Sequence, residues 1–136
     1  MPTPKPLIWN GREIAQLPEG DAKNEVSPTW TNLNLLNLWT NKTGTTAQYR
    51  KYPSGIVEVK FWLTKLTLPL LGESLFILPL LHRPKEEYQF PAVMTDSKKA
   101  YILGHLNVGS DGNVGFFSNK MDINTEVRGR LVFGVD

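Results

Sequence analysis

Few side chains in this chain of 136 residues could do acid–base or metal chemistry, and they are widely spaced. There are two histidines, His82 and His105, and no cysteine. No His-Glu-x-x-His, Gly-x-Ser-x-Gly or P-loop pattern occurs. Glu86 and Glu87 form a carboxylate pair, but adjacent residues of a strand point to opposite faces. A glycosidase needs two carboxylates across one cleft. Because no motif marks such a pair, we expect a protein that is not an enzyme.

The composition excludes further classes. Without cysteine there is no disulfide, no cysteine–zinc site and no cysteine nucleophile. The stretch around Asp111, "SDGNVG", is too short for a calcium loop and lacks its terminal Glu, so Asp111 is expected to serve a turn. A formal net charge of +2, with both signs interleaved, argues against a nucleic-acid partner. We expect no metal and no cofactor.

The chain also lacks the signals of a membrane or exported protein. No apolar run reaches the roughly 18 residues that span a bilayer. The N-terminus "MPTPKPLIW" has no apolar core of signal-peptide length. The sequence therefore predicts no membrane insertion and no ordinary export signal.

Short β-strands must position the candidate side chains. Ten prolines and eleven glycines divide the chain, and no stretch of twelve residues or more has a clean helical period. Two strands alternate clearly. One places on a single face Val57, Val59, Phe61 and Leu63. The other does the same with Val127, Leu131, Phe133 and Val135.

Turn residues and further strands complete the pattern. Pro53 with Gly55, and Asp111 with Gly112, predict tight turns. Further strands are expected near residues 33–39, 74–79, 90–94, 99–107 and 113–117. About eight strands suffice for two facing sheets, so the fold class is an all-β sandwich.

The first 28 residues differ from the rest. Asn10-Gly11 between two apolar runs predicts a hairpin, and a polar stretch bounded by prolines follows it. We expect a neck or attachment segment over residues 1–28 and a β-sandwich head over residues 29–136.

Surplus apolar residues suggest an interface. Trp62 falls on the face of Glu58 and Lys60, which the alternation assigns to solvent, so it is a candidate for a rim or a contact between subunits. The alternative is that Trp62 lies under a loop. The run "LPLLGESLFILPLLHRP" holds more apolar side chains than one face of a small sandwich needs, and burial between subunits would relieve the excess.

Several segments, in this order, carry a resemblance: "WTNLNLLNLWTN", "AQYRKYPSGIVEVKFWL", "LFILPLLHRP", "DGNVGF" and "RGRLVFGVD". They resemble the C-terminal head of phage tail-fibre and baseplate receptor-binding proteins over roughly residues 28–136. That family typically reads "LLNGW", "AQYRK", "LP.GYRP" and "DG.V". Leu38 replaces the usual Gly of the first motif, and Leu80-Leu81-His82 replaces the approach to Pro84.

The resemblance implies a jelly-roll-like antiparallel sandwich that forms a homotrimer. It implies attachment to a bacterial cell-wall polysaccharide or teichoic acid, and a place in the virion, at the phage tail tip or baseplate, after synthesis in the host cytoplasm. It also implies that the neck binds other phage tail proteins.

In the lactococcal members, His, Asp, Trp and Arg of the last strands form the saccharide pocket. The matching residues here are His105, Asn107, Phe117, and Arg128 or Arg130. Asn107 stands in place of Asp, and Phe117 in place of Trp. An arginine pair would also suit phosphate groups.

Other interpretations of these residues stay open. His105 could be a buried histidine, Phe117 could pack in the core, and the arginines could form a solvated or intersubunit face. His82 and Arg83, which precede Pro84, are expected in a rim loop or an interface.

The function predicted from these features is that of a phage or prophage receptor-binding protein whose trimeric head attaches to host cell-wall saccharides. One alternative is a structural baseplate or fibre component without its own sugar site. A further alternative, which fewer features favour, is a hydrolase of wall polysaccharide.

Overall fold

The structure is a computed structural model that describes residues 5–9, 12–17, 27–118, 120 and 122–135, with the backbone alone for residues 5–9 and 12–17. The N-terminal strands β1 (Lys5–Trp9) and β2 (Arg12–Leu17) pair antiparallel, and Trp9 lies opposite Arg12. The predicted hairpin is therefore present, although its turn, Asn10-Gly11, lies outside the described residues. The same is true of most of the predicted polar neck, and the boundary near Pro28 stays a prediction.

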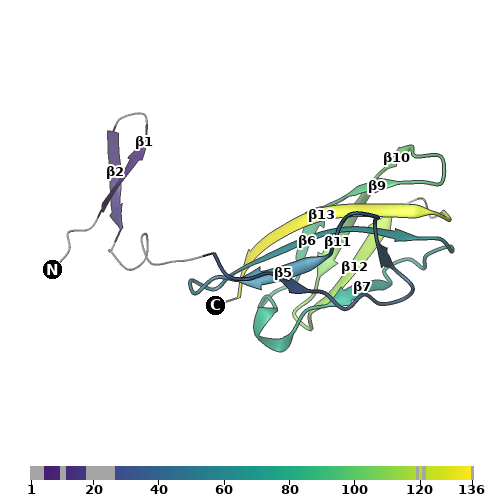
Figure 1. Ribbon diagram of the computed structural model, residues 1–136, viewed down its shortest axis with the longest axis horizontal. Helices are drawn as coiled ribbons and strands as arrows, with labels where there is room; N and C mark the ends of the chain where they lie inside the picture. The colour runs from purple at the N-terminus through teal and green to yellow at the C-terminus, as the bar shows by residue number, and fades with distance from the viewer. Residues whose placement is uncertain (1–4, 10–11, 18–26, 119, 121, 136) are drawn as a thin grey trace.

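The other strands form two antiparallel sheets (Figure 1). The larger sheet has seven strands in the order β10-β9-β13-β6-β5-β3, with β4 also paired to β6. Its strands are β3 (Thr31–Asn32), β4 (Thr40–Asn41), β5 (Gln48–Lys51), β6 (Ile56–Lys65), β9 (Val93–Thr95), β10 (Tyr101–Ile102) and β13 (Thr125–Gly134). The four-stranded sheet has the order β7-β12-β11-β8. Its strands are β7 (Ser74–Ile77), β8 (Tyr88–Pro91), β11 (Gly104–Val108) and β12 (Asn113–Ser118), and a single 3-10 turn, η1 (Leu80–His82), follows β7.

The pairing of eight of these strands is nested. β6 pairs with β13, β7 with β12, β8 with β11, and β9 with β10. The first strand of the set thus lies beside the last, the second beside the second last, and so inward to a tight turn at residues 96–100. The pairs β6–β13 and β9–β10 belong to the larger sheet, and the other two pairs belong to the four-stranded sheet.

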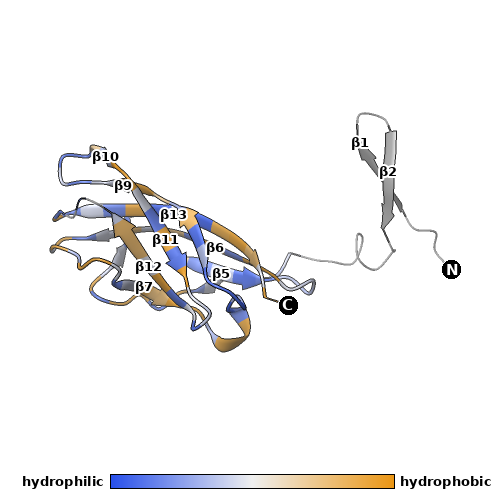
Figure 2. Ribbon diagram, turned by 180° about the vertical axis from the view of Figure 1, so that it is seen from behind, coloured by the Kyte–Doolittle hydropathy of each residue, from blue (hydrophilic) through white to orange (hydrophobic). Residues whose placement is uncertain are grey.

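The core lies between the two sheets. Phe61 of the larger sheet contacts Phe76 of the smaller one, with ring centroids 5.5 Å apart, and Trp39 meets Phe116 edge-on at 5.2 Å. The predicted inward residues of β6 are all buried, and so are Val127, Leu131 and Phe133 of β13. In Figure 2, β12 is largely hydrophobic and β5 hydrophilic. The all-β prediction is confirmed, and two packed antiparallel sheets are consistent with a β-sandwich.

The predicted turns are also confirmed. Gly55 and Gly112 have φ of 90° and 87°, which favours glycine. Asp111 accepts hydrogen bonds from the backbone N–H and the side-chain amide of Asn113, as expected for a turn residue.

The strand predicted over residues 33–39 is not present as such. Leu35 forms an isolated bridge to Phe76, Leu36 N–H donates to Leu75 O, and Asn37 and Leu38 turn the chain with positive φ. This segment passes from the edge of the larger sheet to the edge of the smaller one and back to β4. The alternation of Asn and Leu therefore corresponds to burial of residues where the segment crosses between the two sheets, and not to the two faces of a single strand.

Candidate functional site

Three of the predicted saccharide-binding residues lie together on the outer face of the four-stranded sheet. His105 and Asn107 belong to β11, and Phe117 belongs to β12. Their neighbours Leu106, Val108 and Phe116 are fully buried, so the alternation of the strands turns His105, Asn107 and Phe117 outward. The hypothesis that Phe117 packs in the core is wrong, because it lies on the outer face.

The sheet register brings two of these rings into contact. His105 is directly opposite Phe117 in the antiparallel pair β11–β12. Residues opposite one another have adjacent side chains on the same face. The two rings are stacked, with centroids 5.3 Å apart and planes 9° from parallel. The two rings face one another, so their outer faces and edges are what they can offer to a ligand, and an aromatic face can pack against the C–H face of a sugar ring.

Phe117 lines two hollows. One, of about 460 Å³, is lined by Leu71, Leu103 and the His105–Phe117 pair. The other, of about 380 Å³, is polar, and its lining includes Ser74, Glu87, Asn107, Asp111, Asn113 and Phe117. An aromatic surface beside a group of planar amides and carboxylates can bind a hydroxyl-rich ligand.

The polar hollow offers hydrogen-bonding groups that are held in place. Ser74 Oγ lies 2.8 Å from Asn113 Oδ1. Hydrogen bonds from the side chain and backbone of Asn113 hold the pKa of Asp111 below its usual range, so its carboxylate is an acceptor at neutral pH. Asn107 Oδ1 is buried and has no hydrogen-bond partner among the described residues. Such an atom is costly unless a ligand or water satisfies it.

Glycines shape the floor of this site. A Cβ at Gly72 would lie 2.9 Å from the ring of Phe117, and Gly72 also has a φ of 76°. A Cβ at Gly115 would lie 2.8 Å from the carbonyl oxygen of Gly72. Only glycine therefore allows the 72–74 segment to pack against the Phe117 ring and to line the polar hollow.

Arg128 and Arg130 do not join this group within one chain. They lie on the outer face of β13, which belongs to the larger sheet, while His105 and Phe117 lie on the outer face of the other sheet. The core separates the two outer faces. The single pocket predicted from the sequence is therefore divided between opposite faces of the subunit.

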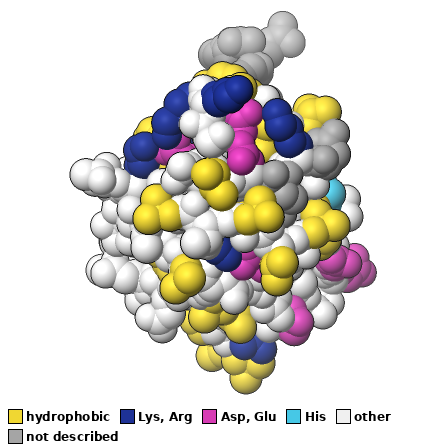
Figure 3. All heavy atoms as spheres, turned by 90° about the vertical axis from the view of Figure 1, so that its right-hand side faces the viewer, with side chains coloured by type: hydrophobic (Ala, Val, Ile, Leu, Met, Phe, Trp, Pro, Cys, Tyr) yellow, Lys and Arg dark blue, Asp and Glu magenta, His cyan; other side chains and the backbone are white. Residues whose placement is uncertain are grey.

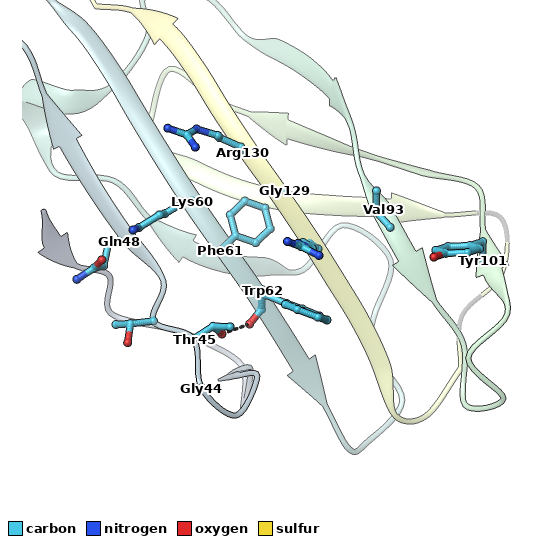
Figure 4. A pocket seen from close by; sticks show the side chains of 12 residues that line it. Gly44, Thr45, Gln48, Lys60, Phe61, Trp62, Val93, Tyr101, Gly129 and Arg130 are labelled. Atoms are coloured by element: carbon cyan, nitrogen blue, oxygen red, sulfur yellow. Dashed lines mark hydrogen bonds between the residues drawn. The ribbon is translucent and has the colours of Figure 1, made fainter.

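The arginines lie instead beside Trp62, in a groove that Figure 4 shows from close by. Arg128 is directly opposite Trp62 in the β6–β13 pair, and its guanidinium carbon lies 4.4 Å from the centre of the Trp62 ring. Trp62 is half-buried. Lys42, which directly follows β4, places its Nζ 5.8 Å from the centre of the same ring. The prediction that Trp62 faces outward with Lys60 is confirmed.

Two carboxylates on the larger sheet are neutralised by cations. Glu58 lies between Arg130, at 2.7 Å, and Arg50, at 2.9 Å. Hydrogen bonds from Arg130, then Tyr52 and Arg50, lower the pKa of Glu58 to about 2. Glu126 lies 2.7 Å from both Lys42 and Lys99, and these lysines lower its pKa to about 2. Neither carboxyl group is suited to act as a general acid near neutral pH.

His82 and Arg83 lie at η1. The His82 ring meets Tyr49 edge-on at 5.0 Å, and its buried Nδ1 has no hydrogen-bond partner among the described residues. Arg83 Nε donates to Leu78 O at 2.9 Å. These contacts hold the 78–84 segment to the sandwich, whereas Leu80 and Leu81 of the same turn are exposed.

Tyr101, Asn113 and Gly72 line these hollows and were missed from the sequence. Tyr101 sits on a two-residue strand that periodicity could not define. Asn113 follows the Asp111 turn, and that turn was the available signal for it. Across the described parts of the chain, no three Asp, Glu or His side chains are grouped to hold a metal ion. No described helix is long and apolar enough to cross a membrane.

No protein-family model matches the chain, and no curated protein matches it with significance.

Proposed function

We propose that this chain is a phage or prophage receptor-binding protein, whose head attaches to a host cell-wall polysaccharide or teichoic acid through the outer face of the four-stranded sheet. The observation that carries the proposal is the stacked His105–Phe117 pair beside the polar hollow of Asn107, Asp111 and Asn113. Aromatic rings and fixed polar groups together are what a sugar requires, since a sugar ring has an apolar C–H face and a hydroxyl rim.

The nested strand pairing supports a jelly-roll-like fold for the head. A jelly roll is an eight-stranded, double-sheet arrangement built from Greek keys. Pairing of the first strand with the last, as in β6 with β13, and of each following pair inside it, is what a long antiparallel ribbon produces when it folds over into two sheets.

Exposed apolar side chains support a homotrimer. Leu66 and Leu38 lie at the same end of the sandwich, because β4 pairs with the end of β6, and Leu66 O accepts from Asn124 N–H beside Ile123. Leu71 and Leu103 line one hollow there. Figure 3 shows hydrophobic side chains over this end. The large apolar residues of this end that are at least 48% exposed are Leu38, Leu66, Leu68, Leu70, Leu71, Leu103 and Ile123.

Surfaces of this kind mark association sites, and the sequence segment expected to carry surplus apolar residues supplies three of these residues, Leu68, Leu70 and Leu71. In a trimer, several weak saccharide contacts act together, and the effective concentration raises the overall affinity. In this proposal the head lies at the tail tip or baseplate of the virion, and the N-terminal segment binds other tail proteins.

Binding to purified cell walls of candidate hosts, and to a glycan array, tests the saccharide proposal. Phe117→Ala and His105→Ala are expected to weaken binding at least tenfold, because each removes one of the two stacked rings. Tyr88→Ala is the matched control, since Tyr88 is an aromatic residue of the same sheet that lines neither hollow.

Unchanged binding in both site variants would place the saccharide elsewhere. An absence of wall binding in the unaltered protein would favour a structural tail component. Release of reducing ends from wall polysaccharide would favour a hydrolase. The mass in solution tests the trimer, and a monomer at micromolar concentration would remove the avidity argument.

A further inference from the structure

We propose that the groove around Trp62, on the outer face of the larger sheet, is a second binding site, which takes an anionic polysaccharide through its phosphate or carboxylate groups. It lies on the opposite face from the His105–Phe117 site and does not depend on it. The groove has a volume of about 830 Å³, the largest of the hollows described above (Figure 4).

The lining of the groove is strongly biased in charge. Its described lining residues include three cations, Lys60, Arg128 and Arg130, and no Asp or Glu. The whole chain, by contrast, carries 15 basic and 13 acidic residues. A concave surface with one sign of charge attracts ligands of the opposite sign.

Two of these cations have no carboxylate partner among the described residues. Arg130 is bound to Glu58, but the contacts of the other two are with aromatic rings. Arg128 lies 4.4 Å from the centre of the Trp62 ring, and Lys60 Nζ lies 4.3 Å from that of Trp30. Stacking uses the face of a guanidinium and leaves its in-plane N–H donors free. Trp62 therefore orients Arg128 without using the donors that bind an oxyanion.

The strand register places the two free cations within reach of one ligand. Arg128 is opposite Trp62, and Arg130 is opposite Lys60. Lys60 and Arg128 are consequently diagonal neighbours on adjacent strands, a relationship with a spacing of roughly 7–8 Å. This spacing separates the two strand positions, and Figure 4 shows the Lys60 side chain pointing towards Gln48 and away from β13. The two cations therefore suit two neighbouring anionic groups along a polymer, and charge-assisted hydrogen bonds of this kind are the stronger ones.

The aromatic residues favour a saccharide over a nucleic acid. Single-stranded nucleic acids bind largely by stacking bases on open aromatic faces. Trp62 is half-buried and has Arg128 and Lys42 against its ring. The open aromatic is Tyr101, which is 82% exposed and stands beside Val93 at one side of the groove (Figure 4). The polar side chains of Gln48 and Thr46 line the opposite side of the groove. One exposed ring at one side and polar groups at the other suit a saccharide chain that carries anionic substituents.

Titration calorimetry on the full chain tests this site with four probes: poly(glycerol phosphate), polygalacturonate, dextran and oligothymidylate. We expect one or both of the anionic saccharide-type polymers to bind, with an affinity that falls as salt is added, and dextran not to bind in this groove. The phosphate and carboxylate polymers then distinguish the two sources of anion.

Arg128→Gln and Lys60→Gln are each expected to weaken that binding about tenfold, which corresponds to about 1.4 kcal/mol. Lys85→Gln is the matched control, because it removes the same charge at an exposed position that does not line the groove. Failure here is distinguishable from failure of the proposed saccharide function, because Lys60 and Arg128 line neither hollow beside Phe117. Their variants report on the groove, whereas Phe117→Ala and His105→Ala report on wall binding at the other face.

Three results would overturn the proposal. One is that neither anionic polymer binds at low ionic strength. Another is that Arg128→Gln and Lys60→Gln weaken binding no more than Lys85→Gln does, since that would indicate a general charge effect. The last is tighter binding of oligothymidylate than of both anionic polymers.

Discussion

Lys65 Nζ lies 2.8 Å from both carboxylate oxygens of Glu73, and each side chain is only 8% exposed. The Oε1 atom of Glu73 also accepts a hydrogen bond from Leu70 N–H at 2.9 Å. The pair joins the end of β6 to the residue that precedes β7. It therefore closes the base of the loop that carries the exposed leucines and braces Gly72 against Phe117.

Removal of one partner of this pair is expected to be strongly destabilising. Lys65→Met leaves the carboxylate of Glu73 buried without its cation, and we expect the free energy of unfolding to fall by about 3 kcal/mol. Urea unfolding measures this. The double variant Lys65→Met, Glu73→Leu is expected to recover part of the loss, because it removes both charges. A loss below about 1 kcal/mol in the single variant would show that the pair is solvated.

Stability is expected to fall at acidic pH through Glu58 and Glu126. Each has a folded pKa of about 2 against an ordinary value of 4.5. Because the folded pKa is depressed, the stabilisation is complete above about pH 4.5 and is lost as the pH falls towards 2. We expect about 1–2 kcal/mol for each carboxylate. A full shift would correspond to about 3 kcal/mol, but Arg130 and Lys99 are more than half exposed, and solvent weakens such pairs.

Glu58→Gln directly tests the predicted loss of stability at acidic pH. It should lower stability at pH 7 and flatten the loss between about pH 4.5 and 2, since it removes one of the two titrating groups. Urea unfolding at several pH values compares the variant with the unaltered chain. An equal loss in the free energy of unfolding at acidic pH in both proteins would show that Glu58 does not contribute to it.

His82 is expected to add a separate step at milder pH. Burial, with a smaller effect of the charge on Lys51, lowers the pKa of His82 below 6.5. A histidine with a depressed folded pKa contributes stability that is present above pH 6.5 and is lost as the pH falls below that value. His82→Phe should abolish the decline that begins as the pH falls below 6.5, and it also removes the buried Nδ1, which has no partner among the described residues. Imidazole proton shifts measured by NMR against pH check the assignment.

The residues of the long strands that face the core could be predicted, because their positions depend only on the local alternation of apolar and polar residues. Every second residue from Val57 to Leu63 is buried, and β13 follows the same rule. Strand ends were harder to predict. The expected strands near 90–94 and 99–107 are each divided, at Ala92 and Leu103, where the chain passes from one sheet to the other. The alternation of apolar residues does not show where the chain passes from one sheet to the other.

The candidate site could be predicted only where a short turn fixes the geometry. His105 and Phe117 are opposite one another because the tight turn at Asp111-Gly112 sets the register of β11 and β12. The position of Arg128 depends instead on a pairing between β13 and β6, whose paired residues are 60 or more positions apart along the chain. Local sequence does not show which sheet a closing strand joins, so the sequence could not show that the arginines and His105 lie on opposite outer faces of one chain.

Leu38 adopts a backbone conformation that is costly for its residue type. Its φ is 66°, and the preceding Asn37 has a φ of 54°. The left-handed region costs a non-glycine residue about 1–2 kcal/mol, while glycine adopts it freely. Leu38 stands at a position where the sequence comparison above predicts a glycine. Its side chain is 77% exposed, so its replacement sacrifices little packing.

We therefore expect Leu38→Gly to raise the free energy of unfolding by about 0.5–1 kcal/mol, after allowance for the greater freedom of glycine in the unfolded chain. Leu38→Ala is the matched control, because it removes the same exposed side chain and keeps the strained φ. Urea unfolding of both variants at neutral pH separates the two effects. Equal gains in both variants would assign the benefit to the lost apolar surface, and a loss of stability in Leu38→Gly would show that the Leu38 side chain makes a stabilising contact that outweighs the backbone strain.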